Sequence, residues 1–212
     1  MKIRVKICGI TRVEDAVTAA DAGVDAIGLV FFSGSRRCVS IEQAQKIVHA
    51  LPPFVSAVGL FVNADATEVN QVLNTVPLDI LQFHGDETPA FCRQFARPFM
   101  KAIRVKSRED IQAAAEHFPD ARALLFDAYV HGQFGGTGQC FDWQMLPENL
   151  PCAWVLSGGL NEGNIKEALA ASGAAAVDIS SGAESSAGIK DAIKIRALMR
   201  AIRAQENTEN RF

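Results

Sequence analysis

Short apolar segments and amphipathic segments alternate eight times along this chain, and this alternation constrains the fold more than any single motif. Runs rich in β-branched and apolar residues predict strands near residues 3–8, 26–31, 55–61, 78–83, 98–104, 122–127, 153–157 and 175–180. Helical periodicity and N-cap signals predict helices near residues 12–22, 40–50, 65–75, 88–96, 107–117, 142–147, 161–172 and 188–203.

Strands that alternate with helices indicate a parallel sheet. Eight such units in 212 residues favour a single-domain (β/α)8 TIM barrel, and an open doubly wound sheet is the alternative. A hydrophobic content of 49% is enough for one well-filled core. We expect one domain over residues 1–204, followed by a polar tail at residues 205–212 that frays.

Charge and cysteine content narrow the functional class. The formal net charge of -3 gives no basic footprint for nucleic acid, so we expect a small-molecule partner. Five scattered cysteines without a C-x-x-C pair suggest neither a disulfide framework nor a zinc site, and they indicate a reducing cytoplasm. No signal peptide is visible, and the longest mostly apolar run, residues 53–62, is far shorter than the ~20 residues of a membrane span. We expect a cytoplasmic protein without membrane contact.

Cys8 ends the first predicted strand, directly before the glycine turn at Gly9. The alternation of strand side chains places Lys6 on the same face as this thiol. A neighbouring cation favours the thiolate, which is the reactive form of cysteine. A small buried cysteine with only a packing role is the alternative.

In a parallel barrel the ligand lies at the carboxyl ends of the strands. Polar residues follow each predicted strand: Cys8, then Ser33 to Arg37, Asn63, Gln82 and His84, Arg104, Asp127, Ser157-Gly158-Gly159, and Ser180-Ser181-Gly182. We expect these residues to surround one site.

Two of these strand ends carry exposed backbone amides that suit a phosphate. Gly158 and Gly159 follow the seventh strand, and Ser181 and Gly182 follow the eighth, where a short helix would aim its positive end at the same point. Glycines that only form turns are the alternative. The glycine-rich segment at residues 135–138 lacks the phosphate-loop pattern, and we interpret it as a lid over the site.

Six segments of the chain resemble, in order, the signatures of the phosphoribosylanthranilate isomerase family of tryptophan biosynthesis. They are Lys6-Ile-Cys-Gly-Ile-Thr11, Ser35-Arg-Arg-Cys-Val-Ser40, Gln82-Phe-His-Gly85, Gly135-Gly-Thr-Gly-Gln-Cys-Phe-Asp-Trp143, Leu156-Ser-Gly-Gly-Leu160 and Val177-Asp-Ile-Ser-Ser-Gly182. The resemblance covers nearly the whole chain. It departs from the family at Arg36, Cys38, Phe83 and Ser157, none of which is the acid or the base that the resemblance implies.

The resemblance implies an Amadori rearrangement, an intramolecular aldose-ketose isomerisation of N-(5-phosphoribosyl)anthranilate to 1-(2-carboxyphenylamino)-1-deoxyribulose 5-phosphate. It assigns Cys8 as the general base and Asp127 as the general acid. It also places Arg37 at the substrate carboxylate. We expect His84 to line the aromatic pocket or to orient a neighbour, and a strand-end histidine with only a structural role is the alternative. We expect Gly136 to belong to the lid.

Asp178 lies on the strand that would close the barrel against the first strand, so we expect it to pair with Lys6 and to belong to the substrate site. The reaction requires no cofactor. His49, His117 and His131 lack the spacing of metal ligands, and we expect no metal.

Two other functions remain open from the sequence. A related isomerase that acts on an aminoimidazole sugar phosphate would need carboxylates as both acid and base, whereas this chain offers a thiol. A non-catalytic phosphosugar-binding barrel would bind its ligand without turnover. We expect a monomer, because no apolar stripe extends beyond what the core needs.

Overall fold

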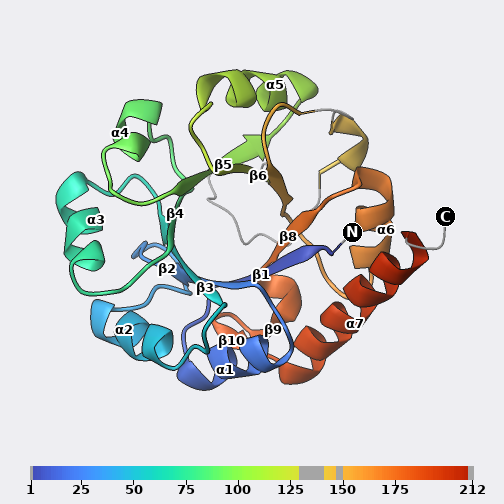
Figure 1. Ribbon diagram of the computed structural model, residues 1–212, viewed down its shortest axis with the longest axis horizontal. Helices are drawn as coiled ribbons and strands as arrows, with labels where there is room; N and C mark the ends of the chain where they lie inside the picture. Colours follow the sequence, from blue (N-terminus) through green and yellow to red (C-terminus); the bar gives the residue numbers. More distant parts are fainter. Residues whose placement is uncertain (1, 129–140, 147–149, 210–212) are drawn as a thin grey trace.

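A computed structural model describes residues 2–128, 141–146 and 150–209 of the protein and shows a closed barrel of parallel strands (Figure 1). The barrel strands are β1 (Arg4–Cys8), β2 (Ala26–Val30), β3 (Ser56–Phe61), β4 (Ile80–Phe83), β5 (Phe99–Val105), β6 (Ala123–Ala128), β7 (Trp154–Leu156) and β8 (Ala176–Ile179). Each strand pairs with the next along the chain, and β8 closes the ring by pairing with β1. The predicted (β/α)8 barrel is therefore confirmed, and a closed ring excludes the open doubly wound sheet.

Helices surround the barrel as an outer ring (Figure 1). They are α1 (Val13–Asp21), α2 (Ile41–His49), α3 (Ala66–Leu73), α4 (Pro89–Arg93), α5 (Arg108–His117), α6 (Ile165–Ser172) and α7 (Ala192–Glu209), with 3-10 turns over Trp143–Met145 and Ser181–Ala183. The capping box predicted at the start of α3 is present, since Glu68 N donates to Asp65 Oδ1 at 2.9 Å and Asp65 N donates to Glu68 Oε2 at 3.0 Å. Local capping therefore fixes where this helix begins.

The inward-facing side chains change character along the barrel axis. Alternate strand residues face the helices or the barrel interior, and the helix-facing set, such as Ile7 and Phe83, belongs to the main apolar core. The inward set near the amino ends of the strands is apolar and comprises Ala26, Val58, Ile80, Met100, Ala102, Ala123, Leu125, Val155 and Ala176. Near the carboxyl ends, the inward set from β4, β6, β7 and β8 is polar and buried, and includes Gln82, His84, Asp127, Ser157 and Asp178. The apolar layer thus closes one end of the barrel, and the polar layer forms the floor of a site at the other.

A hairpin follows the eighth strand where the sequence predicted the start of a helix. It is formed by β9 (Glu184–Ser186) and β10 (Ile189–Lys190), and Gly188 in its turn has a φ of +81°, a left-handed conformation that suits glycine. The predicted helix over 188–203 instead begins at Ala192, because Asp191 Oδ1 accepts hydrogen bonds from Ile193 N and Lys194 N.

Residues 205–209 of the predicted tail lie in α7, which continues through Glu209. Glu206 Oε1 accepts a hydrogen bond from Ile3 N at 2.6 Å, and Arg203 Nη1 donates to Ile3 O at 2.9 Å. The last helix is therefore stabilised by contacts with the beginning of the first strand.

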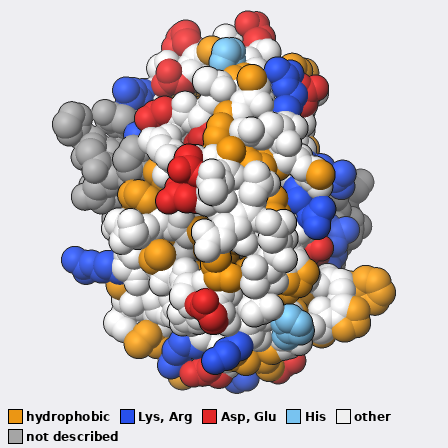
Figure 2. Space-filling view, turned by 90° about the vertical axis from the view of Figure 1, so that its left-hand side faces the viewer, with side chains coloured by type: hydrophobic (Ala, Val, Ile, Leu, Met, Phe, Trp, Pro, Cys, Tyr) orange, Lys and Arg blue, Asp and Glu red, His pale blue; other side chains and the backbone are white. Residues whose placement is uncertain are grey.

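The outer surface shows no feature that points to a membrane or to nucleic acid on the face in view. Figure 2 shows the side of the molecule that carries α3 and α4, where acidic and basic side chains are interspersed and hydrophobic side chains form small groups. Across the described ranges, no helix combines the length and the apolar character that a bilayer span requires.

Candidate active site

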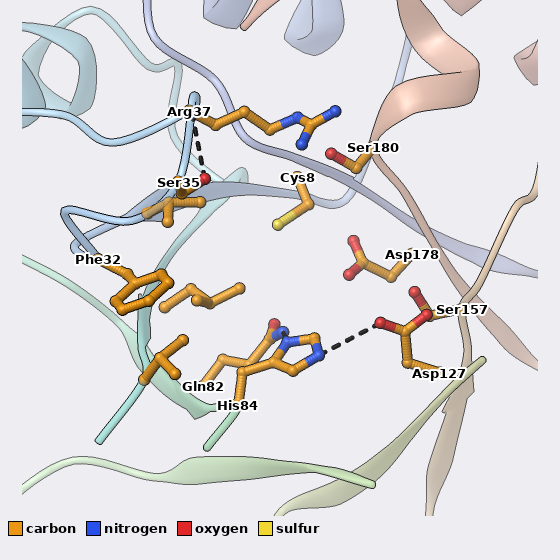
Figure 3. A pocket seen from close by; sticks show the side chains of 13 residues that line it. Cys8, Phe32, Ser35, Arg37, Gln82, His84, Asp127, Ser157, Asp178 and Ser180 are labelled. Carbon is orange, nitrogen blue, oxygen red and sulfur yellow. Dashed lines mark hydrogen bonds and ion pairs between the residues drawn. The ribbon is translucent and has the colours of Figure 1, made fainter. Parts of the chain in front are cut away.

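A pocket opens at the carboxyl ends of the strands and is lined by the inward side chains described above (Figure 3). It brings together five predicted site residues from separate parts of the sequence: Cys8, Arg37, His84, Asp127 and Asp178. One wall of the pocket is apolar and is formed by Val30, Phe32, Leu60 and Val62. Asp127 and Asp178 lie on the opposite side from Phe32, so a ligand in this pocket meets an apolar wall and a carboxylate-bearing wall.

Cys8 points into the pocket from the end of β1, below the guanidinium of Arg37 in Figure 3. The predicted pair between Lys6 and Asp178 is present, with Lys6 Nζ donating to Asp178 Oδ1 at 2.9 Å. Gly28 on the neighbouring strand makes room for this arrangement, because a methyl group there would lie 2.7 Å from Cys8 Sγ and 3.0 Å from Lys6 Nζ. A side chain at this position of β2 would therefore displace both groups.

The protonation equilibrium of Cys8 differs from the sequence-based expectation. Burial raises the pKa of the Cys8 thiol, and the neighbouring Lys6 ammonium, which favours the thiolate, only partly offsets this effect. Burial also disfavours the charge of Lys6, but the attraction of Asp178 and of Cys8 outweighs it and raises the pKa of Lys6. Lys6 thus stays charged beside a thiol that is harder to ionise than an exposed cysteine.

Asp127 is buried at the end of β6, with its carboxyl group facing His84. Its Oδ1 atom accepts a hydrogen bond from Ala128 N at 2.9 Å. Its Oδ2 atom lies 3.2 Å from His84 Nε2, although the two atoms do not form a hydrogen bond. Gly158 approaches from β7, and a methyl group there would lie 2.8 Å from Ala128 N and 3.1 Å from Asp127 Oδ1. The structure therefore places Gly158 beside the predicted acid as well as in the predicted phosphate loop.

The loop that carries His84 is held by a buried ion pair. Glu87 accepts hydrogen bonds from Asn63 N and from Gly85 N, each at 2.9 Å. Lys101 Nζ lies 3.2 Å from Glu87 Oε2 and donates to Gly85 O at 2.7 Å. This cluster joins the ends of β3 and β4 to the interior of β5 and holds the backbone next to His84.

Arg37 reaches the pocket from the loop after β2. Its backbone N donates to Ser35 Oγ at 3.1 Å, and its aliphatic stem lies against Gly9, where a methyl group would collide with Arg37 Cδ. Gly9 has a φ of +75°, so both its conformation and its lack of a side chain suit this contact. The guanidinium forms a two-point ion pair with Glu184 of β9, through Nε to Oε1 and Nη2 to Oε2, both at 2.8 Å.

The two glycine loops predicted to hold a phosphate lie next to each other. Gly182 touches the loop after β7 so closely that a methyl group there would collide with Leu160 O. Gly158 and Gly159 both have positive φ values, +90° and +62°. Gly158, Gly159 and Ser181 line a second hollow. This hollow adjoins the main pocket, because both are also lined by Asp127, Ser157, Asp178 and Ser180. Within the described part of the chain, no hydrogen bond engages the backbone N–H of Gly159 or Ser181.

Gly136 and the predicted glycine-rich lid lie outside the described residues. Three residues of the site, Gly28, Glu184 and Lys101, were not predicted from the sequence. Their pattern offered little signal, because a glycine inside a strand and isolated charges far along the chain are common features of unrelated barrels.

Comparisons with known proteins agree over nearly the whole chain. A sequence model of the family described as N-(5'phosphoribosyl)anthranilate (PRA) isomerase matches residues 5–201. The N-(5'-phosphoribosyl)anthranilate isomerase of Neisseria meningitidis serogroup B is 58% identical over 198 residues, covering 93% of this chain and 95% of that protein.

Solved structures give the same result. The crystal structure of phosphoribosyl anthranilate isomerase from Thermotoga maritima has a TM-score of 0.87 at 36% identity, covering 95% of this chain and 99% of that chain. A phosphoribosyl anthranilate isomerase crystallised with reduced 1-(o-carboxyphenylamino)-1-deoxyribulose 5-phosphate has a TM-score of 0.82 at 34% identity, with coverage of 95% and 99%.

Proposed function

The chain belongs to the N-(5'-phosphoribosyl)anthranilate isomerase family, and from this premise we propose how its own residues carry out the reaction. The protein is an intramolecular aldose-ketose isomerase of tryptophan biosynthesis that converts N-(5-phosphoribosyl)anthranilate to 1-(2-carboxyphenylamino)-1-deoxyribulose 5-phosphate. An acid protonates the ring oxygen and opens the ribose to a Schiff base, and a base removes the C2' proton to give an enolamine. Protonation at C1' and loss of the proton from the C2' hydroxyl then yield the ketone, so the rearrangement consumes no external oxidant.

Cys8 is the general base in this proposal. It lies at the end of β1 with its sulfur directed into the pocket, and the charged groups that act on it include Lys6, Asp178, Arg37 and Lys190. Lys6, Arg37 and Lys190 carry positive charge, which stabilises the thiolate once it forms. A substrate with its C2' atom beside Sγ can therefore transfer its proton to Cys8.

Asp127 is the general acid. Its carboxyl group lies on the opposite side of the pocket from Phe32, so a ribose between the apolar wall and this carboxyl presents its ring oxygen to Asp127. The carboxylate that remains after proton donation accepts a hydrogen bond from Ala128 N. Gly158 leaves the space that this carboxyl occupies.

Substrate orientation depends on two anionic groups of the substrate. Arg37 binds the anthranilate carboxylate by charge-assisted hydrogen bonds, and the aromatic ring packs on the apolar wall that includes Phe32 and Leu60. The phosphate binds the open backbone N–H groups of Gly159, Ser181 and Gly182. Holding the substrate at both ends places the ribose between Cys8 and Asp127.

The observation that carries this assignment is that Cys8 and Asp127 line one pocket together with Arg37 and next to the glycine loops. The test is turnover of freshly prepared N-(5-phosphoribosyl)anthranilate, followed by loss of substrate fluorescence. Turnover that is lost in both Cys8→Ser and Asp127→Asn supports the assignment. Turnover only with an aminoimidazole sugar phosphate would favour the related isomerase. Binding without turnover would favour the non-catalytic phosphosugar-binding barrel.

The assembly state and location of the protein are further proposals. We propose a monomer in the cytoplasm, because this chain by itself supplies the proposed acid, the proposed base and the groups proposed to bind both ends of the small phosphosugar. Light scattering coupled to size-exclusion chromatography measures the mass directly. A mass of twice 22.8 kDa would contradict the monomer.

A further inference from the structure

The contact between Arg37 and Glu184 determines which edge of the guanidinium faces the pocket. Nε and one hydrogen of Nη2 are taken by the two carboxylate oxygens, each at 2.8 Å. A guanidinium has five N–H donors in a fixed plane, so three donors on Nη1 and Nη2 remain. Figure 3 shows this free end of Arg37 above Cys8, on the pocket side.

Glu184 is itself held by a second cation, Lys190. Lys190 Nζ donates to Glu184 Oε1 at 2.8 Å and to Ser180 O at 3.1 Å, and its side chain is 1% exposed. One carboxylate therefore lies between two cations. The cluster as a whole keeps one positive charge, which is what an incoming carboxylate needs.

The hairpin that carries Glu184 and Lys190 is fixed to the rest of the barrel. Lys190 N donates to Asp15 Oδ2 at 3.0 Å, and Asp15 in turn accepts from Arg12 Nη2 at 2.6 Å. Lys194 Nζ at the start of α7 donates to Glu184 O at 2.6 Å. Glu184 thus stands on a backbone that is anchored to both α1 and α7.

We propose that Glu184 is a positioning residue that holds Arg37 in the orientation required to bind the substrate carboxylate, and so sets the preference for a carboxylated aromatic amine. This inference rests on the proposed role of Arg37. An arginine side chain has many rotamers, and ordering it only when the substrate arrives would reduce affinity. The two-point contact with Glu184 orders the guanidinium before binding, as a supporting residue does for a binding site.

The test compares two substrates in four proteins. The substrates are N-(5-phosphoribosyl)anthranilate and N-(5-phosphoribosyl)aniline, which differ only in the carboxylate. The proteins are the wild type, Glu184→Gln, Arg37→Lys and Asp15→Ala. For each protein, the ratio of kcat/KM for the two substrates measures recognition of the carboxylate.

Glu184→Gln keeps the volume of the side chain but sets an amide N–H₂ against Nη2–H of Arg37, which breaks the two-point contact. The ratio should fall about tenfold, mainly through a higher KM for the carboxylated substrate, while turnover of the aniline substrate stays within about twofold. Arg37→Lys should lower the ratio at least as far, because an ammonium lacks the fork. Asp15→Ala loosens the same hairpin but leaves the contact between Glu184 and Arg37 itself intact, so it should lower Tm and change the ratio much less than Glu184→Gln does.

Three outcomes would overturn the proposal. The first is a wild-type ratio of kcat/KM values in Glu184→Gln together with a much lower ratio in Arg37→Lys. This result would show that Arg37 binds the carboxylate without help from Glu184. An equal ratio in the wild type and in Arg37→Lys would instead remove the proposed role of Arg37 and the inference with it. A fall in Asp15→Ala as large as in Glu184→Gln would reduce Glu184 to a structural role. If Glu184→Gln does not fold, Glu184→Asp replaces it, because this side chain keeps the charge but is too short for both contacts. Its ratio of kcat/KM values should also fall, and an unchanged ratio would contradict the proposal.

Discussion

His84 Nε2 lies 3.2 Å from Asp127 Oδ2 at the floor of the pocket, and each side chain is only 6% exposed. The amide Nε2 of Gln82 lies 3.2 Å from His84 Nδ1. With Gln82 as the donor, a neutral His84 carries its proton on Nε2, the atom that faces Asp127. The Nε2 atom of His84 is therefore directed at the carboxyl group of Asp127, while Gln82 contacts the other side of the ring.

Asp127→Asn should abolish most of the activity and leave binding nearly intact. The amide has the size of the carboxyl group and can still accept from Ala128 N, but it cannot donate an acidic proton. We expect kcat to fall by at least ~10²-fold with KM changed little, since an acid acts only as the transition state forms. Steady-state kinetics on the fluorescent substrate measures both constants. Asp120→Asn, at an exposed aspartate far from the pocket, is the matched control, and near-normal turnover in Asp127→Asn would show that the acid lies elsewhere.

Cys8→Ser should also reduce kcat by at least ~10²-fold, because a hydroxyl is similar in size to a thiol but a far weaker base than a thiolate. Cys92→Ser is the control, as Cys92 is buried in α4 outside the pocket and burial raises its pKa to about 12. The control variant should keep wild-type kinetics. If Cys8→Ser retains near-full turnover, the thiol has only a packing role.

The pH dependence of Cys8 follows from the sign of its pKa shift. Burial raises the pKa of this thiol above its ordinary value, so the thiolate is scarce at neutral pH and increases as the pH rises. Alkylation of Cys8 by iodoacetamide should therefore be slower at pH 7 than that of the exposed Cys38, and its rate should rise about tenfold per pH unit until the thiol ionises. Mass spectrometry of the labelled peptides gives both rates. Lys6→Met removes a cation that favours the thiolate, so it should slow alkylation of Cys8 further. Faster alkylation in this variant would show that Lys6 does not stabilise the Cys8 thiolate.

Gly159→Ala should weaken phosphate binding more than it slows the chemistry. Gly159 has a φ of +62°, and alanine in this left-handed region costs roughly 1 kcal/mol and tilts the N–H groups of the loop. We expect KM and the inhibition constant of inorganic phosphate to rise while kcat changes little. Gly173→Ala is a matched control, because Gly173 has a φ of +64° at the end of α6, away from the pocket, and open space around it. Both variants should lose similar stability, and an equal rise in KM in both would contradict a phosphate role for Gly159.

The sequence was sufficient for the fold and for the residues at the strand ends, because both depend on local periodicity. Strand alternation placed Lys6 and Asp178 on inward faces of adjacent strands, and the two side chains do form an ion pair. The same parity could not give the sign of the Cys8 pKa shift. That sign depends on how completely the thiol is removed from water, which is a property of the packed barrel and not of the strand.

The ion pairs that join Arg37, Glu184 and Lys190 could not be predicted from sequence patterns for a different reason. Glu184 is 147 residues away from Arg37 along the chain, and no periodicity links two residues at that separation. The hairpin that carries Glu184 was mistaken for the start of a helix, since Gly188 in a turn and the helical pattern after residue 192 overlap in any window used to detect periodicity. Gly28 was not predicted because it acts by leaving room for the side chains of Cys8 and Lys6, and this proximity is known only from the folded structure.

The hydrogen bond from Ile3 N to Glu206 has a consequence for the order of biosynthetic folding. The two residues lie 203 positions apart. Ile3, directly before β1, can therefore form this hydrogen bond only after Glu206 has left the ribosome. Until β8 and α7 are synthesised, β1 keeps an unpaired edge, which is the kind of edge that recruits other unfinished chains. Closure of the ring is then a late, long-range event, and a chain that stalls shortly before its last helix presents that edge to chaperones and to aggregation.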